Sequence, residues 1–153
     1  MLLITFQLGE DWYALDTAQV AEVLPMVLLK GIPGSAQGVT GIFNYHGRPV
    51  PVIDLAEMAL GTPTEARMST RIILVRYPDE GESRLLGLLA ERATDVLRCS
   101  EADFSDPGLS ADETPYLGPV TRVNEKIIQL VKVDSLLSDN VRTQLFRHSA
   151  GVA

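Results

Sequence analysis

The apolar residues of this chain fall in short runs that are separated by turns rich in glycine, proline and acidic residues. The densest part, residues 41–55, reads Gly-Ile-Phe-Asn-Tyr-His-Gly-Arg-Pro-Val-Pro-Val-Ile-Asp-Leu and predicts a strand, a tight turn at His46-Gly47 and a second strand. Runs this short cannot span a bilayer, which needs about 20 apolar residues. We therefore expect a fold built mainly of short β-strands, as in small barrels.

The rest of the chain repeats this pattern of short strands joined by turns. Val23 to Leu29 contains Pro25, which favours an edge or bent strand because proline cannot donate to a ladder. Asn124-Glu125 is expected to be the turn of the last hairpin. Strands are expected at 2–8, 12–15, 23–29, 71–77, 85–90, 116–123 and 127–133.

Two short helices and a linker complete the expected architecture. Asp54 is placed to cap a helix that runs through Leu60, and the polar segment 61–70 is the expected subdomain boundary. A C-terminal helix at about 135–147 is expected to pack back on the domain, because apolar residues recur there every four positions. This narrow stripe comprises Leu137, Val141 and Leu145.

Two segments of the first half recur in the second half. Residues 13–24 resemble residues 86–97, and both end in an acidic residue, valine and leucine, at an offset of 97 − 24 = 73 residues. Residues 50–53 resemble residues 128–131, at an offset of 128 − 50 = 78 residues. The two echoes favour a pair of similar β-units with a groove between them. Chance similarity between apolar strands is the alternative.

Composition and charge argue against several classes of protein. Hydrophobic residues make up 46% of the chain, which is ample for a core, and the net charge is −7 with no cluster of cations. Nucleic acids and anionic membranes are therefore disfavoured as partners. Cys99 is the only cysteine, so no internal disulfide is possible, and the first residues are typical of a strand rather than a signal peptide. We expect a cytoplasmic protein without direct membrane insertion.

The sequence offers little equipment for catalysis. It has no phosphate-binding loop, and Gly34-Ser-Ala-Gln-Gly38 is one residue too long for a nucleophile elbow. The two histidines and Cys99 are far apart, so no metal or other cofactor is expected. His46 is a conceivable catalytic base, but its place in a turn favours an interaction or a solvated side chain. The acidic segment 103–113 fails the EF-hand pattern and is expected to be a solvated loop.

The order of several motifs resembles the CheW-like family of bacterial chemotaxis coupling proteins. The resemblance rests first on Asn44-Tyr-His-Gly47 followed by Val50-Pro-Val-Ile-Asp-Leu55. Residues 6–16, Phe-Gln-Leu-Gly-Glu-Asp-Trp-Tyr-Ala-Leu-Asp, are similar to the family's opening hairpin, and residues 20–23 to the short segment after it. The second half agrees at residues 86–91, 95–97 and 127–136.

The resemblance implies a mainly β fold of two SH3-like five-stranded β-barrel subdomains with short helices. It implies a scaffold without catalytic activity that couples the cytoplasmic tip of a methyl-accepting chemoreceptor to the regulatory domain of a CheA-type histidine kinase in receptor arrays. Other CheW-like proteins are a further expected class of partner. Residues 1–153 would form a single CheW-like domain of two intertwined subdomains.

The same resemblance assigns candidate contact residues. For the receptor they are Val20, Glu22, Val23, Asn44, His46, Gly47, Leu88 and Ala90. For the kinase they are Ile42, Arg48, Val50 and Val52. His46 departs from the family, which has arginine in its Asn-x-Arg-Gly turn, and that arginine can pair with the acid matched by Glu22. Histidine is shorter and mostly neutral at pH 7, so the departure suggests a specialised pathway, with Arg48 as a partial substitute.

A protein of another class remains the competing interpretation. The groove between two barrels would then be the pocket of an enzyme or a small-molecule sensor. Such a pocket needs a few convergent polar groups, and the segments expected to line it are mainly aliphatic.

Overall fold

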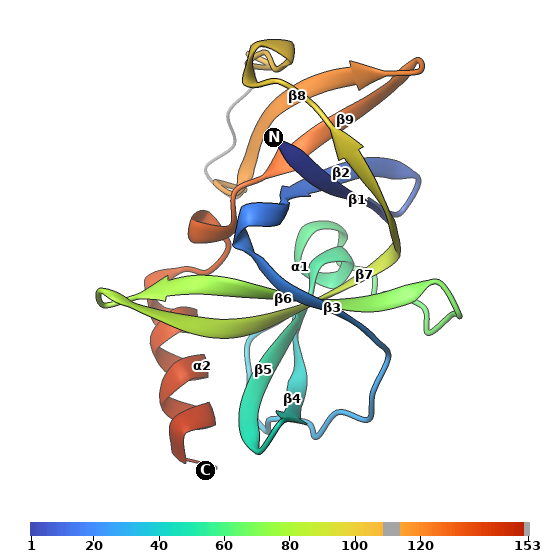
Figure 1. Ribbon diagram of the computed structural model, residues 1–153. Helices are drawn as coiled ribbons and strands as arrows, with labels where there is room; N and C mark the ends of the chain where they lie inside the picture. The colour runs from blue at the N-terminus through green and yellow to red at the C-terminus, as the bar shows by residue number, and fades with distance from the viewer. Residues whose placement is uncertain (109–113, 152–153) are drawn as a thin grey trace.

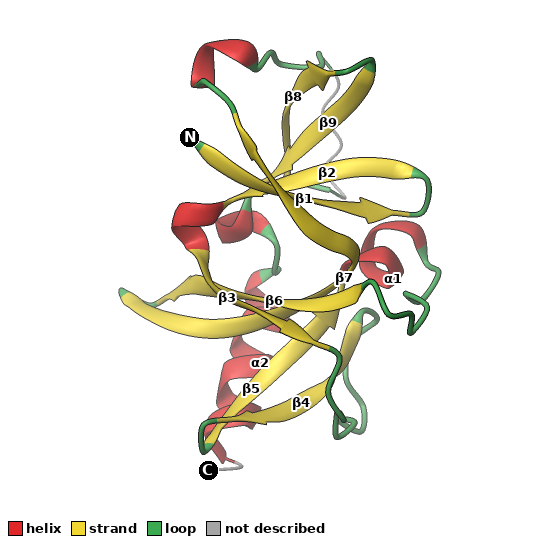
Figure 2. Ribbon diagram, turned by 45° about the vertical axis from the view of Figure 1, so that its right-hand side comes forward, coloured by secondary structure: helices red, strands yellow, loops and turns green. Residues whose placement is uncertain are grey.

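The structure, a computed structural model, describes residues 1–108 and 114–151 and is mainly β, as the sequence predicts. Two α-helices and three short 3-10 helices accompany the strands (Figures 1 and 2). The strands are β1 (Leu2–Leu8), β2 (Asp11–Asp16), β3 (Val20–Pro25), β4 (Val39–Tyr45), β5 (Arg48–Asp54), β6 (Thr70–Asp79), β7 (Glu82–Arg98), β8 (Leu117–Val123) and β9 (Lys126–Val131). The helices are η1 (Thr17–Gln19), α1 (Leu55–Leu60), η2 (Glu101–Asp103), η3 (Val133–Ser135) and α2 (Asp139–Gly151).

Strand pairing sorts the strands into two units that share β7. The lower unit of Figure 1 contains β3, β6, the first part of β7, β5 and β4, which pair in that order. The upper unit contains the last part of β7, then β1, β2, β9 and β8. Strand β7 pairs with β6 over 82–91 and with β1 over 91–98. Arg92 lies at the changeover and has a positive φ of 54°.

The registers confirm that the two sequence echoes are a structural repeat. Ala14 of β2 pairs in parallel with Leu130 of β9, and Gly87 of β7 pairs in parallel with Val52 of β5. The two pairs occupy equivalent positions of the repeat. The offset of the first echo leads from Ala14 to Gly87, because 14 + 73 = 87, and the offset of the second leads from Leu130 to Val52, because 130 − 78 = 52. Each unit therefore contains a parallel strand pair, and the same two repeated segments form that pair in both units.

The two halves of the sequence exchange strands between the units. The first half supplies β1 and β2 to the upper unit and, after the crossover at η1, β3 to β5 to the lower unit. The second half supplies β6 and the first part of β7 to the lower unit and, after the crossover within β7, the remaining strands to the upper unit. The segment 61–70, expected to divide the subdomains, runs from the end of α1 to the start of β6, and the strands on either side of it in the sequence, β5 and β6, both belong to the lower unit. That expectation is corrected: the segment separates the sequence halves, while the units are separated at the two crossovers.

The core has three parts. One lies inside the lower unit and is formed by Phe43, Val50, Val52, Ile72, Leu74 and Leu89. A smaller one lies inside the upper unit and is formed by Leu3, Ala14, Cys99 and Ile128. The largest joins the two units and α2, and its members include Ile4, Phe6, Leu15, Ile73, Val75, Leu86, Leu88 and Ala90. The space between the units is thus largely filled with aliphatic side chains.

Asp54 organises the segment that follows β5. Its buried carboxylate accepts hydrogen bonds from the amides of Ala56 and Glu57, at 3.1 and 3.2 Å, and so caps α1 as expected. It also accepts from the amide and hydroxyl of Thr64, at 2.8 and 2.6 Å. Gly61 ends the helix with a φ of 76°. One side chain therefore fixes both the helix and the loop after it.

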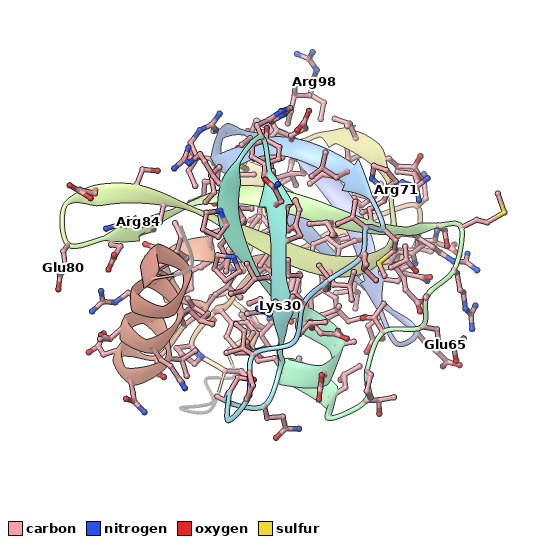
Figure 3. The ribbon with its side chains drawn as sticks, turned by 90° about the horizontal axis from the view of Figure 1, so that it is seen from below. Lys30, Glu65, Arg71, Glu80, Arg84 and Arg98 are labelled. Atoms are coloured by element: carbon pink, nitrogen blue, oxygen red, sulfur yellow. The ribbon has the colours of Figure 1, made fainter. Side chains whose placement is uncertain are left out.

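The C-terminal helix begins at Asp139 rather than near 135, and it lies against β5 and the hairpin of β6 and β7. Leu145 and Phe146 are buried in the joint core. The Tyr77 hydroxyl accepts a hydrogen bond from the Leu137 amide at 3.2 Å. The Asp79 carboxylate pairs with Arg142 of α2 and, at 3.3 Å, with Arg84. Figure 3 shows Arg84 on this hairpin, beside the helix.

Two further expectations differ from the structure or fall outside it. The predicted strand 23–29 is wrong in its bounds: the strand in this region is β3, and its ladder with β6 runs from Val20 to Pro25. Residues 109–113 of the acidic segment 103–113 lie outside the described residues. No helix among the described residues has the length and apolar character to cross a membrane.

Candidate functional site

The hairpin turn between β4 and β5 presents a short polar surface at one end of the lower unit. His46 and Gly47 occupy its centre with φ values of 50° and 85°, which is the pattern of a type I′ turn. The Asn44 side chain accepts a hydrogen bond from the Gly47 amide at 2.7 Å and closes the turn. The side chains of Asn44, His46 and Arg48 are exposed, so the turn is available to a partner.

Tyr45 connects this turn to β3. Its ring stands edge-on to the His46 ring, with centroids 4.5 Å apart, and edge-on to Phe43 at 6.2 Å. A hydrogen bond with the Glu22 side chain raises the pKa of Tyr45, and desolvation and the negative charge of Glu22 act in the same direction. Arg48 lowers it. Residues from β3 and from the turn therefore form one polar cluster.

Strand β3 lies at the edge of the sheet and presents several candidate residues. It pairs with β6 alone, with a register shift between Val20 and Glu22. Glu22 and Val23 are exposed, and Val20 is partly buried. The Arg76 guanidinium donates to the Val20 carbonyl at 3.2 Å and so holds the start of the strand.

A groove runs along the outer side of β4. It encloses about 530 Å³ and is lined by Leu28, Leu29, Lys30, Ile42, Phe43, Asn44, Gly47 and Pro49. The amides of Lys30 and Ile42 each donate to the other residue's carbonyl at 2.8 Å, which seats residues 28–30 beside the strand. We call this feature the β4 groove. Figure 3 views the molecule from this end and labels Lys30.

The bridge beside β4 depends on Gly41. A Cβ atom at this position would lie 2.5 Å from the Lys30 carbonyl oxygen, which is backbone and cannot move away cheaply. We expect Gly41→Ala to break the Lys30–Ile42 bridge, to speed amide hydrogen exchange at both residues, and to lower the free energy of unfolding by about 1–3 kcal/mol. Gly31→Ala is the matched control, since a Cβ there meets open space. Equal exchange rates in the two variants would contradict this expectation.

Comparison with known proteins places this geometry in a family. The CheW-like domain family matches residues 2–141 of the chain. The chain belongs to the CheW-like family. Relatives include "Chemotaxis protein CheW" of Helicobacter pylori, 24% identical over 136 residues, covering 88% of this chain and 79% of the relative. Another is "Chemotaxis protein CheW" of Treponema pallidum, 28% identical over 147 residues, covering 89% of this chain and 81% of the relative.

A solved structure agrees with the family assignment. The crystal structure of the scaffolding protein TtCheW from Thermoanaerobacter tengcongensis superposes with a TM-score of 0.78 at 26% identity, covering 92% of this chain and 89% of that chain. The family match, the relatives and this shared fold identify the chain as a chemotaxis coupling scaffold.

Placement on the CheW-like fold divides the candidate contact residues into two groups. Glu22, Val23, Asn44, His46, Gly47 and Arg48 are exposed, Val20 is partly buried, and Ile42 is mostly buried but lines the β4 groove. The groove thus brings Ile42, assigned to the kinase, beside Asn44 and Gly47, assigned to the receptor. The partner roles of these residues remain predictions.

Four candidates require correction because their side chains are inside the protein. Val50 and Val52 have exposed fractions of 2% and 0% and fill the lower unit. Leu88 and Ala90 are fully buried in the core that joins the two units. Both faces are covered over residues 50–54 of β5 and residues 86–90 of β7, so these four side chains cannot reach a partner directly. These side chains support the surface from beneath rather than contact a partner.

Three residues of the site were missed by the sequence analysis. Tyr45 and Arg76 act through contacts with β3, on a distant part of the chain, which no local pattern indicates. Leu28 is an exposed leucine on the β4 groove, and its place in an apolar run suggested a strand instead. Among the described residues, no three side chains of the metal-binding types lie together.

Proposed function

We propose that this CheW-like protein couples a methyl-accepting chemoreceptor to a CheA-type histidine kinase by docking both, without chemistry of its own. The β4 groove is the observation that carries the proposal. Its lining is mainly apolar and open, and Leu28, with an exposed fraction of 95%, stands in it without cover. Exposed apolar side chains beside a strand edge are typical of a docking surface.

The kinase's regulatory domain suits this groove. Backbone groups of alternate residues face the same side of a strand, so those of Asn44 point the same way as those of Ile42, which already bridge to Lys30. An extended segment of the partner can continue that bridge along β4. The regulatory domain, by the family resemblance, has the same fold and offers strands of matching geometry. Lys30, which lines the groove and is exposed, favours acidic residues in the partner.

The receptor tip is assigned to the other side of the turn. Val23 and Glu22 on β3 give an apolar and an acidic contact at a sheet edge, and His46 stands nearby on the turn. One element, the β4–β5 turn, therefore borders both docking surfaces. A change at one surface is felt at the other through this shared element, which is what a coupling protein requires. Binding to both partners would recruit the protein to receptor arrays.

Leu28→Glu tests the kinase assignment. The substitution places a charge in the middle of the β4 groove, where desolvating it without a partner is costly. We expect affinity for the regulatory domain of the CheA-type kinase, measured by isothermal titration calorimetry, to fall about tenfold or more. Met68→Glu is the matched control, since Met68 is also 95% exposed but lies in the linker before β6. Equal affinities of the two folded variants would contradict the assignment.

A further inference from the structure

Glu22 is the acidic residue of the receptor-facing edge, and its own strand gives it no charged partner. No ion pair is recorded for Glu22 among the residues that the structure describes. A carboxylate on an exposed edge strand samples many rotamers and presents no fixed direction to a partner. A group that holds the carboxylate would therefore decide what this edge recognises.

Tyr45 is built into position to hold it. The tyrosine is half-buried on the lower unit's core, against which Ala21, the neighbour of Glu22, also packs. Its ring is fixed edge-on between Phe43 and His46. The type I′ turn, closed by the hydrogen bond between Asn44 and the Gly47 amide, fixes the backbone beneath it. A phenol held at its ring presents its hydroxyl in one direction with few rotamers to lose.

We propose that Tyr45 is the positioning residue of the receptor-facing edge: its hydroxyl donates to the Glu22 carboxylate and orients it toward the turn, beside His46. The inference rests on the proposed function for its consequence in binding, but the contact itself does not. A phenol is neutral, so the negative charge of Glu22 is not neutralised by an internal ion pair and remains available to a partner.

The recognition chemistry follows from this charge. An ion pair within the edge would present a nearly neutral surface, whereas a carboxylate held by a phenol presents a negative one. We infer that the native receptor tip places a cation, a lysine or arginine side chain, against Glu22. A tip without that cation would bind less well, because a desolvated carboxylate would be left without a charged partner.

The contact is tested first in the free protein. The chain has four tyrosines, and their ionisation can be followed separately by NMR with ¹³C-labelled tyrosine. The neutral phenol donates to the carboxylate, and the phenolate is repelled by it, so Glu22 holds the pKa of Tyr45 above its ordinary value. Glu22→Gln is expected to lower the pKa of Tyr45 and to leave that of Tyr13 unchanged. An unchanged pKa of Tyr45 would overturn the inference whether or not any receptor binds.

The consequence is tested by titration of the native receptor tip. Tyr45→Phe keeps the ring contacts and removes the hydroxyl, so we expect a loss of affinity of about two- to fivefold. Adding His46→Arg to Tyr45→Phe should not restore native binding, because arginine neutralises Glu22; Tyr13→Phe is the control and should bind normally. Equal binding by wild type and Tyr45→Phe would refute the positioning role. Wild-type protein that binds no receptor tip would instead refute the proposed function, with the pKa result still standing.

Discussion

Val50→Asp is expected to unfold the protein rather than to weaken a single interface. The side chain is 2% exposed and packs among Phe43, Val52 and Ile72 inside the lower unit. A carboxylate there loses its hydration and finds no partner, which costs several kcal/mol whether it stays charged or takes up a proton. We expect a loss of about 4 kcal/mol or more, a large share of a typical domain's stability. Circular dichroism during urea unfolding measures it.

Val96→Asp is the matched control for this change. Val96 is also a strand valine, in β7, but its side chain is 61% exposed. The same substitution should therefore change the free energy of unfolding by less than about 1 kcal/mol. If Val50→Asp kept the wild-type stability and lost only kinase binding, Val50 would have to lie on the surface, and the packing of the lower unit described above would be wrong.

Asp54→Ala is expected to be the most damaging loss of a single polar side chain. It removes the acceptor of four hydrogen bonds and leaves the Ala56, Glu57 and Thr64 amides without this partner at a partly buried site. Loss of a helix cap costs about 1 kcal/mol, and each poorly solvated donor adds to it. We expect a decrease of about 3 kcal/mol, or roughly 6–12 °C in Tm, measured by thermal unfolding.

Asp16→Ala provides the comparison. Asp16 caps η1 through one exposed hydrogen bond to the Ala18 amide at 3.0 Å, so its loss should cost less than about 1 kcal/mol. Similar effects of the two alanine substitutions would mean that the hydrogen bonds of Asp54 to Thr64 contribute nothing. The loop at 62–65 would then have to be held by other contacts.

Local chemistry determined much of this fold from the sequence. The His46-Gly47 turn, the Asp54 cap and the last hairpin around Asn124-Glu125 follow from backbone preferences of a few adjacent residues, and the structure has all three. The two echoes also predicted the repeat, because repeated segments that form the same contacts keep the same pattern of side chains. Family membership followed from the order of these same segments.

Only the tertiary structure decided which faces are buried and which distant residues meet. Over residues 50–54 of β5 and 86–90 of β7 both faces are covered, so Val50, Val52, Leu88 and Ala90 became core although their sequence suits a contact surface equally well. The exchange of strands between the units, and the meeting of Tyr45 with Glu22, join residues far apart in the chain. The identity of an apolar side chain does not show whether it is buried. Burial depends on the neighbours that the fold supplies, and strand pairing between residues far apart in the sequence determines those neighbours.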